Sequence, residues 1–379
     1  RRTFYMTDRH LKKVAEKPKL GKKILNFLIT EPNRKKLKRH LKAKARIKMI
    51  RQVSHDREIQ LEGILNACLN HISPITVPLT LISQLPFSGG YLLNRLFDGH
   101  SEIHALPHEL TPATPERGLW PAIDLDHRPE DWFKVLFKEL DIANIQERIK
   151  HGGKRNAIAP FMFLPLVQEQ IFIKYLQSIE SIKRRDVFDA YMTSCFGAWL
   201  DYQNLNGNKK FTTACGPAMA MQQESMESFF DIYPDGRLIS LVRKPETWFA
   251  CACAHEPQIY GNAKEAINRW KESVRVGVDT KKKFGDRVCL IRFEDLIGHT
   301  ESVMHYLSEF LKITYEDILL TPTFDGIPIQ LPNGQNVENS DAKLQRSTKS
   351  RRVDKHQQVL IDKMTIPTYQ TALQHVVIV

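Results

Sequence analysis

The sequence lacks the long apolar run that a membrane-spanning helix requires. It has 379 residues, 42% of them hydrophobic, yet no stretch of about 18 or more consecutive apolar residues occurs. The opening residues, RRTFYMTDRHLKK, also lack the apolar core of a secretory signal peptide. Because 26% of the residues are charged, the composition predicts a soluble globular protein with a sizeable core, located in the cytoplasm.

Cysteine is scarce, and its spacing fits neither a metal site nor a disulfide framework. A domain of this size does not need covalent crosslinks, so the sequence predicts free, buried thiols in a reducing compartment. Cys251 and Cys253 are separated by a single residue, which is not the C-x-x-C spacing of zinc and redox pairs. We therefore expect no metal site. The six cysteines are Cys68, Cys195, Cys215, Cys251, Cys253 and Cys289.

The G-x-x-x-x-G-K-(S/T) motif is also absent, which argues against a P-loop kinase or NTPase. The chain has instead a strand–turn–helix pattern over residues 77–97. An apolar, β-branched run at 77–85 predicts a buried strand, and the turn PFSGGY at 86–91 leads into a helical pattern. Gly89 and Gly90 let the turn bend and let a ligand approach the backbone. Since the first N–H groups of a helix have no internal acceptor and the helix dipole adds positive charge, the pattern predicts an anion site.

Further apolar strand patterns alternate with helical patterns along the chain. This alternation predicts an α/β fold with a central, mostly parallel sheet flanked by helices, since parallel strands need helical crossovers. Ligands of such sheets bind at the carboxyl ends of the strands, and Ser88, His108, Arg243 and Glu294 each follow a predicted strand. The predicted strands cover 77–85, 103–106, 211–215, 238–242 and 288–293, and the predicted helices lie at 130–150, 165–180, 186–203 and 219–233.

Positive charge is concentrated near the N-terminus. The net charge is +12, but residues 1–51 hold 19 Lys and Arg against 3 Asp and Glu, so the remaining chain is net −4. The sequence predicts a basic helical extension over residues 1–71, with one helix around 37–50 and another over 56–71. It predicts that residues 72–379 form the α/β domain. The extension either attracts an anionic partner or membrane surface, or is a solvated helical face. A nucleic-acid partner is not favoured, because aromatic residues are not interleaved with the basic ones.

Four blocks, in chain order, resemble segments of the sulfotransferases that use 3′-phosphoadenosine 5′-phosphosulfate (PAPS). PFSGGYLL…DGHSEI, which begins at residue 86, is similar to their 5′-phosphosulfate loop. RLISLVRKPETWFAC at 237–251 resembles the strand–Arg–x–Pro–helix segment that holds the 3′-phosphate. Residues 288–313 resemble the late strand, (Y/F)-E-D-L turn and helix, and residues 324–340 resemble a Gly-x-Pro…Asn-Ser segment of bacterial members. The resemblance implies a P-loop-like sulfotransferase fold and transfer of a sulfuryl group from PAPS to an acceptor hydroxyl or amine, without a metal.

The resemblance also implies binding roles for particular residues. Arg243 matches the arginine whose guanidinium pairs with the 3′-phosphate. Cys251 stands where relatives carry a serine on the same phosphate, and a thiol is a weaker donor than a hydroxyl. Arg351 belongs to a C-terminal basic loop of the sort that the family folds over the nucleotide. The 5′-phosphosulfate would be gripped by the backbone at Ser88, Gly89, Gly90, Tyr91 and Leu92.

Two residues compete for the role of catalytic base. His108 and Glu109 both lie in the segment where related tyrosyl-protein and carbohydrate sulfotransferases carry their acid–base residue. Counted from Pro86, His108 is nearer to that position, and an unperturbed imidazole pKa of about 6.5 suits proton abstraction at neutral pH. Glu109 is the alternative, and one of the two residues would then orient the other.

Phe87 is the clearest departure from the family pattern. Most relatives carry Lys or Arg there, and that cation stabilises the leaving phosphate oxygen. Gly90 and Tyr91 also replace two threonines. The sequence therefore allows a transferase whose cation comes from elsewhere, a non-catalytic descendant that binds PAPS or its bisphosphate product, or a basic protein that binds nucleic acid or a membrane surface. Candidate sources of the cation are Lys154, Arg155, Lys349, Arg351 and Arg352.

Overall fold

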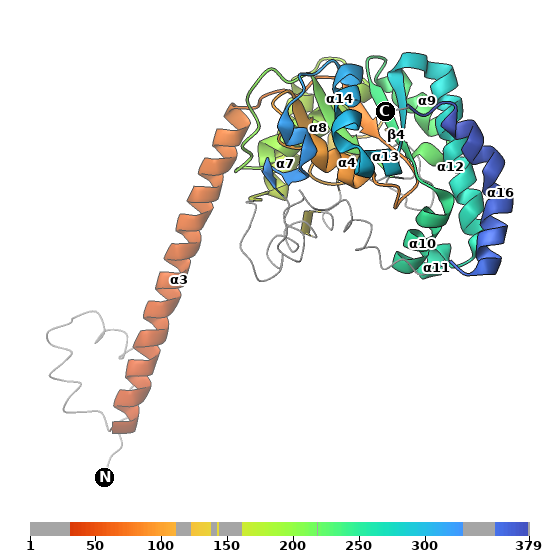
Figure 1. Cartoon of the computed structure of the whole chain (residues 1–379). Coiled ribbons are helices and arrows are strands. Elements are labelled where there is room, and N and C mark those ends of the chain that lie inside the picture. The colour runs from red at the N-terminus through yellow and green to blue at the C-terminus, as the bar shows by residue number, and fades with distance from the viewer. Residues whose placement is uncertain are drawn as a thin grey trace, which may run out of the picture. The chain divides into compact units, whose positions relative to one another are not determined.

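A five-stranded parallel sheet forms the centre of the protein, with strand order β2-β3-β1-β4-β5 in the computed structural model. Helices cover the sheet, and α12 and α16 lie side by side beyond it (Figure 1). The predicted α/β fold is confirmed. The strands are β1 (Leu79–Ile82), β2 (Ile103–Ala105), β3 (Phe211–Cys215), β4 (Arg237–Val242) and β5 (Val288–Arg292). The structure describes residues 31–110, 123–137, 142–143, 161–217, 219–328 and 353–377.

The helices follow the predicted pattern closely, with different ends. The expected helix at 130–150 is described only as far as Leu136, and most of its second half lies outside the described residues. The expected helix at 219–233 is a 3₁₀ turn followed by α9. The helices of this part of the chain are α4 (Gly90–Phe97), α5 (Pro129–Leu136), α7 (Pro165–Gln177), α8 (Arg184–Ala198), α9 (Gln223–Ile232), α10 (Pro245–His255), α11 (Pro257–Tyr260), α12 (Ala263–Phe284), α13 (Phe293–Gly298), α14 (Thr300–Leu311) and α16 (Lys355–Leu373). Three 3₁₀ turns cover Met219–Met221, Gly285–Arg287 and Asp317–Leu320, and a hairpin pairs β6 (Thr323–Phe324) with β7 (Ile327–Pro328).

Strand β1 is shorter than its apolar run of 77–85. All four residues of LTLI are buried, and the strand ends at Ile82. A contact with a distant helix explains the early end: the Leu85 N–H donates to the Ser273 hydroxyl of α12 over 3.1 Å, so this part of the chain pairs with α12 and not with a neighbouring strand. The Ser83 hydroxyl donates to the Gly216 carbonyl over 2.6 Å and fixes the start of this segment.

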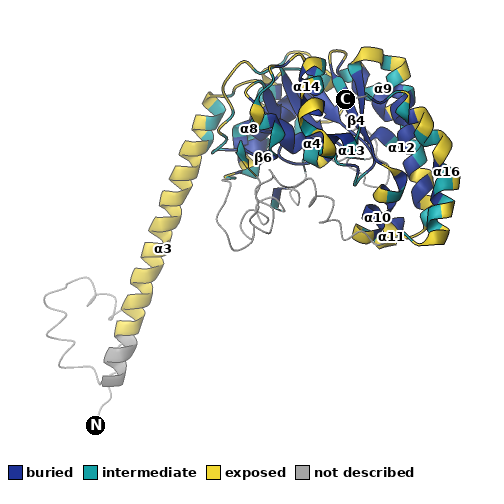
Figure 2. Ribbon diagram, viewed as in Figure 1, coloured by how far each residue is buried: buried dark blue, intermediate teal, exposed yellow. Residues whose placement is uncertain are grey.

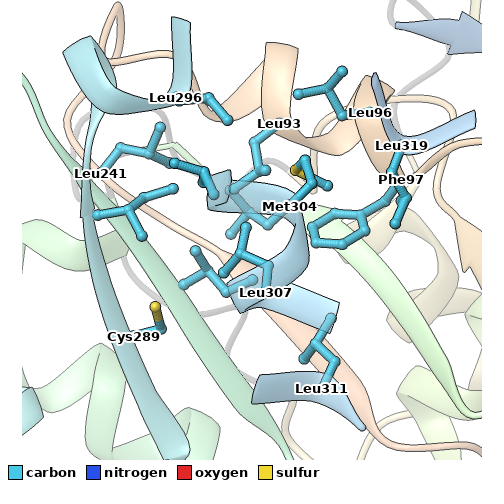
Figure 3. Packing of buried hydrophobic residues seen from close by; sticks show 14 of the residues in the cluster. Leu93, Leu96, Phe97, Leu241, Cys289, Leu296, Met304, Leu307, Leu311 and Leu319 are labelled. Carbon is cyan, nitrogen blue, oxygen red and sulfur yellow. The ribbon is translucent and has the colours of Figure 1, made fainter. Parts of the chain in front are cut away.

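One face of the sheet is covered by α4, α13 and α14. Leu93, Leu96 and Phe97 of α4 are buried at helical i, i+3, i+4 spacing, so they form one apolar face. They pack with Met304 and Leu307 of α14 and with apolar residues of β1, β4 and β5 (Figure 3). This packing fixes the direction in which α4 leaves the turn after β1, and therefore fixes where its N-terminus points.

The order of the strands creates a switch point between β1 and β4. From β1 the chain runs through α4 to the edge strand β2, whereas from β4 it runs through α10 and α12 to the opposite edge strand β5. The loops after β1 and β4 therefore diverge. In parallel sheets such a divergence leaves a crevice at the carboxyl ends of the strands, where ligands bind.

The N-terminal region contains one long helix, α3 (Glu31–Asn70), of 40 residues. The expectation of separate helices around 37–50 and over 56–71 was wrong in this respect, because neither proline nor glycine interrupts the segment between them. Most of α3 is exposed (Figure 2). The chain divides into compact units of residues 1–67 and 68–379. Among the described residues, none of the helices is long and apolar enough to cross a bilayer.

Candidate functional site

The turn between β1 and α4 has the backbone of an anion-binding loop. Gly89 has φ = 102° and is the N-cap of α4, and Phe87 also has a positive φ of 68°. The Leu93 N–H makes the first helical bond, to the Gly89 carbonyl, over 3.1 Å. The amides of Gly90 and its next two neighbours therefore precede the helical ladder and point out of the helix end, where the dipole is positive.

Neither of the two glycines in the turn could carry a side chain without a clash. A Cβ at Gly89 would lie 2.3 Å from the Phe293 ring, and one at Gly90 would lie 2.1 Å from the Gln84 amide nitrogen. Gln84 is 2% exposed, and its Oε1 has no hydrogen-bond partner among the described residues. The Gln84 amide thus occupies the space that a threonine side chain at position 90 would need. Sequence analysis did not identify Gln84, because the contact is made by folding the turn back onto the end of β1.

Arg243 joins the loop after β4 to the turn after β1. Its Nη1 donates to the Phe87 carbonyl over 2.8 Å, and its guanidinium carbon lies 4.4 Å from the centroid of the Phe293 ring. Two tryptophans support this arrangement: the Trp248 indole donates to the Pro86 carbonyl over 2.8 Å, and the Trp270 indole donates to the Arg243 carbonyl over 3.0 Å. The predicted proximity of the glycine turn and Arg243 is therefore present in the structure.

The Arg243 guanidinium is buried without a charged partner. Arg243 is 8% exposed, and its Nε makes no hydrogen bond with a described residue. Among the described residues, no carboxylate lies within ion-pair distance of the guanidinium. A buried cation of this kind is costly unless an anion compensates it. Glu294 lies close by, but its Oε1 accepts from the Lys244 N–H over 3.0 Å and its Oε2 makes no hydrogen bond. The Arg243 guanidinium thus keeps hydrogen-bonding capacity that no described carboxylate uses.

The Phe87 side chain is held in an aromatic cluster. Its ring centroid lies 5.4 Å from that of His255 in α10 and 5.8 Å from that of Tyr260 in α11. Cys251 lies one turn before His255, is 6% exposed, and has its Sγ 3.9 Å from the His255 Nδ1. Packing against α10 and α11 therefore explains an aromatic residue where relatives carry a cation. It also places an imidazole beside the loop.

His108 is buried and turned toward α8. Its Nδ1 lies 3.0 Å from the Glu109 carbonyl oxygen, and its Nε2 lies 3.3 Å from the Tyr191 hydroxyl and 3.8 Å from the Cys195 sulfur. Both ring nitrogens thus have neighbours inside the protein. The structure places His108 at the carboxyl edge of the sheet, as predicted.

Glu109 is half-buried and lies toward the end of β3. The Leu110 N–H donates to the Cys215 carbonyl over 2.7 Å. Burial raises the pKa of the Cys215 thiol, and the negative charge of Glu109 raises that pKa further, while a hydrogen bond to the Gln84 side chain lowers it. Glu109, Cys215 and Gln84 therefore lie near one another at the ends of β3 and β1.

Arg95 and Asn94 fasten the segment after β2 to α4. Arg95 is 1% exposed, its Nη2 donates to the Pro107 carbonyl, and its guanidinium lies 4.8 Å from the ring centroids of Tyr91 and Phe324. The Asn94 amide donates to the Leu106 carbonyl over 3.0 Å. The helix that carries the anion loop therefore also positions His108 and Glu109. The sequence patterns had singled out neither Arg95 nor Asn94.

The remaining predicted residues lie on the same part of the molecule or outside the described residues. Ser88 is buried, whereas Tyr91 is exposed. Arg351 lies outside the described residues, as do Lys154, Arg155, Lys349 and Arg352. None of the six cysteines, all of which lie in the described ranges, forms a disulfide bond. In the described ranges, no group of three or more His, Cys, Asp or Glu side chains is arranged to hold a metal ion.

Comparison with known proteins gives a family and several related structures. A model of the sulfotransferase family matches residues 81–317. A sulfotransferase domain from the curacin biosynthetic pathway is 18% identical, with 77% of this chain and 98% of that chain covered and a TM-score of 0.46. A sulfotransferase domain of the Synechococcus PCC 7002 olefin synthase is 17% identical, with 80% and 95% covered and a TM-score of 0.49. No curated protein matches.

Proposed function

The chain belongs to the sulfotransferase family, and on this premise we propose that it transfers a sulfuryl group from PAPS to an acceptor hydroxyl or amine. The observation that carries the proposal is the Arg243 guanidinium, which is buried, bonded to the glycine turn and without a carboxylate partner among the described residues. Such a group fits a phosphate, because a guanidinium makes paired hydrogen bonds to phosphate oxygens.

The glycine turn would bind the 5′-phosphosulfate of PAPS. The amides at Ser88 through Leu92 supply donors, and the positive end of α4 adds to their effect. Relatives use threonine hydroxyls here, and Gly90 cannot. We assign the missing donor to Gln84, whose amide nitrogen lies in the corresponding space, 2.1 Å from the position of a Cβ at residue 90.

The 3′-phosphate would be bound by Arg243, with Cys251 beside it. Within the described residues the Arg243 Nη1 donates to the Phe87 carbonyl and Nε makes no hydrogen bond, so the rest of the guanidinium would serve the ligand. The Cys251 thiol contributes little as a donor. Arg243 thus serves two roles, since the same guanidinium would read the 3′-phosphate and hold the loop that binds the 5′ end.

The catalytic base is assigned to Glu109, with His108 as a positioning residue. The His108 ring nitrogens face Tyr191, Cys195 and the Glu109 carbonyl, so the imidazole orients the segment. Glu109 is half-buried and its charge acts on Cys215, next to Gln84 of the turn. A carboxylate there would take the proton of the acceptor while the acceptor oxygen or nitrogen attacks the sulfur and the bond between sulfur and the phosphate oxygen breaks.

Charge that builds on the leaving phosphate oxygen needs a donor that Phe87 does not provide. His255 is a candidate within the described residues, because its ring packs on the Phe87 ring and the residue is exposed. A protonated imidazole would donate a hydrogen bond to that oxygen. If no cation takes this role, the chain is a binding protein for PAPS or its bisphosphate product, which is the second candidate function.

The decisive experiment is calorimetric titration of the full chain with adenosine 3′,5′-bisphosphate, followed by an assay of sulfuryl transfer from labelled PAPS to a panel of hydroxyl and amine acceptors. Micromolar binding with transfer supports the enzyme, and micromolar binding without transfer supports the binding protein. No binding at millimolar bisphosphate would overturn both. A cytoplasmic location and an anionic partner of residues 1–51 remain predictions.

A further inference from the structure

Helix α3 carries an apolar stripe with a seven-residue repeat. Residues at alternating spacings of three and four lie along one side of a helix, which is the spacing of the a and d positions of a coiled coil. Four of the six positions are apolar, and Ile47, Ile50, Leu61 and Ile64 are 52%, 56%, 56% and 37% exposed. The six positions are Ile47, Ile50, Ser54, Arg57, Leu61 and Ile64.

An exposed stripe of this kind requires a partner. Isolated helices are marginal in water, and helices in proteins are stabilised chiefly by packing of their apolar face. The four side chains of the stripe are each more than a third exposed in a helix of 40 residues. Scattered exposed apolar residues need no explanation, but a repeated line of them on one helix side indicates an interface.

We propose that α3 pairs with α3 of a second copy of this chain as an antiparallel, two-stranded coiled coil. The two helices would be related by a twofold axis, so each residue pair occurs twice. The apolar stripe of one copy therefore packs against the equivalent stripe of the other copy.

In one register of the two helices, every apolar position of the stripe lies opposite an apolar position and every polar position lies opposite a polar one. Ile47 lies opposite the partner's Ile64, and Ile50 lies opposite the partner's Leu61. Ser54 then lies opposite the partner's Arg57, so the polar positions meet at the centre. A polar layer inside a coiled coil fixes its register at some cost in stability. The pairing leaves no apolar residue of the stripe against a polar one.

The charges of α3 favour the antiparallel direction. Residues 34–51 contain ten Lys and Arg and no acidic residue, whereas residues 52–70 have a net charge of −2. Antiparallel pairing lays the basic half of one helix along the acidic half of the other, and a parallel pair would lay the two basic halves together. The heptad positions that flank the stripe also pair Arg51 with the partner's Glu58, a residue whose carboxylate lies 3.8 Å from the His55 Nδ1 of its own chain.

Sedimentation equilibrium of the full chain tests the interface. We expect a dimer, and we expect Ile50→Asp to raise its dissociation constant about thirtyfold or more, because a charge would be buried in an apolar layer. Met49→Asp is the matched control: Met49 is 69% exposed and lies off the stripe, so this variant should remain dimeric. A wild-type monomer, or a dimer that Ile50→Asp leaves intact, would overturn the proposal.

Disulfide trapping tests the direction. Two variants are prepared in a Cys68→Ser background, one with Ile47→Cys and the other with Ile64→Cys, and they are oxidised alone and mixed. The antiparallel register predicts a crosslink between the two variants and none within either variant. Crosslinks within each variant alone would mean a parallel pair, and no mixed crosslink would mean a different interface. Either result would overturn the register.

Discussion

The Arg243 guanidinium donates a hydrogen bond to the Phe87 main-chain oxygen over 2.8 Å. Residues 156 positions apart in the chain thereby join the loops that follow two adjacent strands, the central strand β1 and its neighbour β4. The same bond leaves part of a buried guanidinium available to a ligand. A substitution of Arg243 should therefore change both the affinity for the ligand and the ordering of the loop that contains Phe87.

Arg243→Ala should weaken binding of adenosine 3′,5′-bisphosphate by about 2–3 kcal/mol, because a charge-assisted pair with the 3′-phosphate is lost. Binding of adenosine 5′-phosphate, which lacks that group, should weaken much less. Calorimetry with both nucleotides measures the difference. Arg275→Ala, a change of a surface arginine on α12, is the control. An equal loss for both nucleotides would mean that Arg243 acts only on the loop.

Gly90→Ala should destabilise the protein by about 1–3 kcal/mol, because the new methyl group would overlap the buried Gln84 amide. Chemical denaturation measures the effect. Gln84→Ala in the same chain should restore much of the loss in stability but not nucleotide binding, which we assign in part to the Gln84 amide. Gly298→Ala is the control, since nothing lies within 4 Å of the added carbon. If the double variant is no more stable than Gly90→Ala, the contact with Gln84 is not the cause.

Phe87→Lys should keep or raise the turnover of a working transferase, because it returns a cation to a loop of the family's shape. Phe87→Met, which is similar in length and uncharged, should not raise it. His255→Gln should lower turnover when residue 87 is Phe. The same substitution should have less effect when it is combined with Phe87→Lys. Single-turnover kinetics with labelled PAPS measures this. In a complex with the bisphosphate, a cationic nitrogen should lie within about 3–4 Å of the 5′-phosphate. Its absence would support the binding-only function.

Deletion of residues 1–67 should leave nucleotide affinity and the melting temperature of the remaining unit nearly unchanged, because the matched family segment begins at residue 81. The truncated chain should be monomeric. Any binding of the full chain to anionic phosphatidylserine vesicles should disappear with the deletion and should weaken with salt in the full chain. A large drop in melting temperature would instead mean that the segment packs on the domain.

Asp325→Asn should make the protein less sensitive to pH between about 4 and 6. Burial raises the pKa of Asp325 from its ordinary 3.8 to about 6, and the charges of Asp98 and Asp201 add to this. The folded state thus holds the proton more tightly than the unfolded state, so this group lowers stability as pH rises through that interval.

Asparagine suits this position, because Asp325 has φ = 54° and accepts a hydrogen bond from the Gln203 N–H over 3.0 Å, which an amide oxygen can also accept. The melting temperature of Asp325→Asn relative to wild type should therefore rise by about 2–4 °C from pH 4 to pH 7, which corresponds to roughly 2 kcal/mol. The control is Asp317→Asn, because Asp317 is the exposed first residue of a 3₁₀ turn. A difference that stays constant over this range would contradict the raised pKa.

Local patterns were sufficient for the fold class and for part of the site. Residues 211–215 form a strand with the predicted bounds, since five buried residues between turn signals have few other solutions. The glycine turn was evident for the same reason, because a positive φ at Gly89 and a helix start at Gly90 are properties of neighbouring residues. The resemblance to sulfotransferases is confirmed by the family match over residues 81–317, which contains three of the four local blocks on which it was based.

Contacts between distant segments decided the rest. The end of β1 depends on a serine of α12, the direction of His108 depends on a tyrosine of α8, and the space at Gly90 depends on how the turn folds back on Gln84. The sequence by itself determined which residues were available at the carboxyl ends of the strands. Only the tertiary structure decided which of them meet, because hydrogen bonds and side-chain packing act over a few ångströms while the sequence separations of these partners span up to 188 positions.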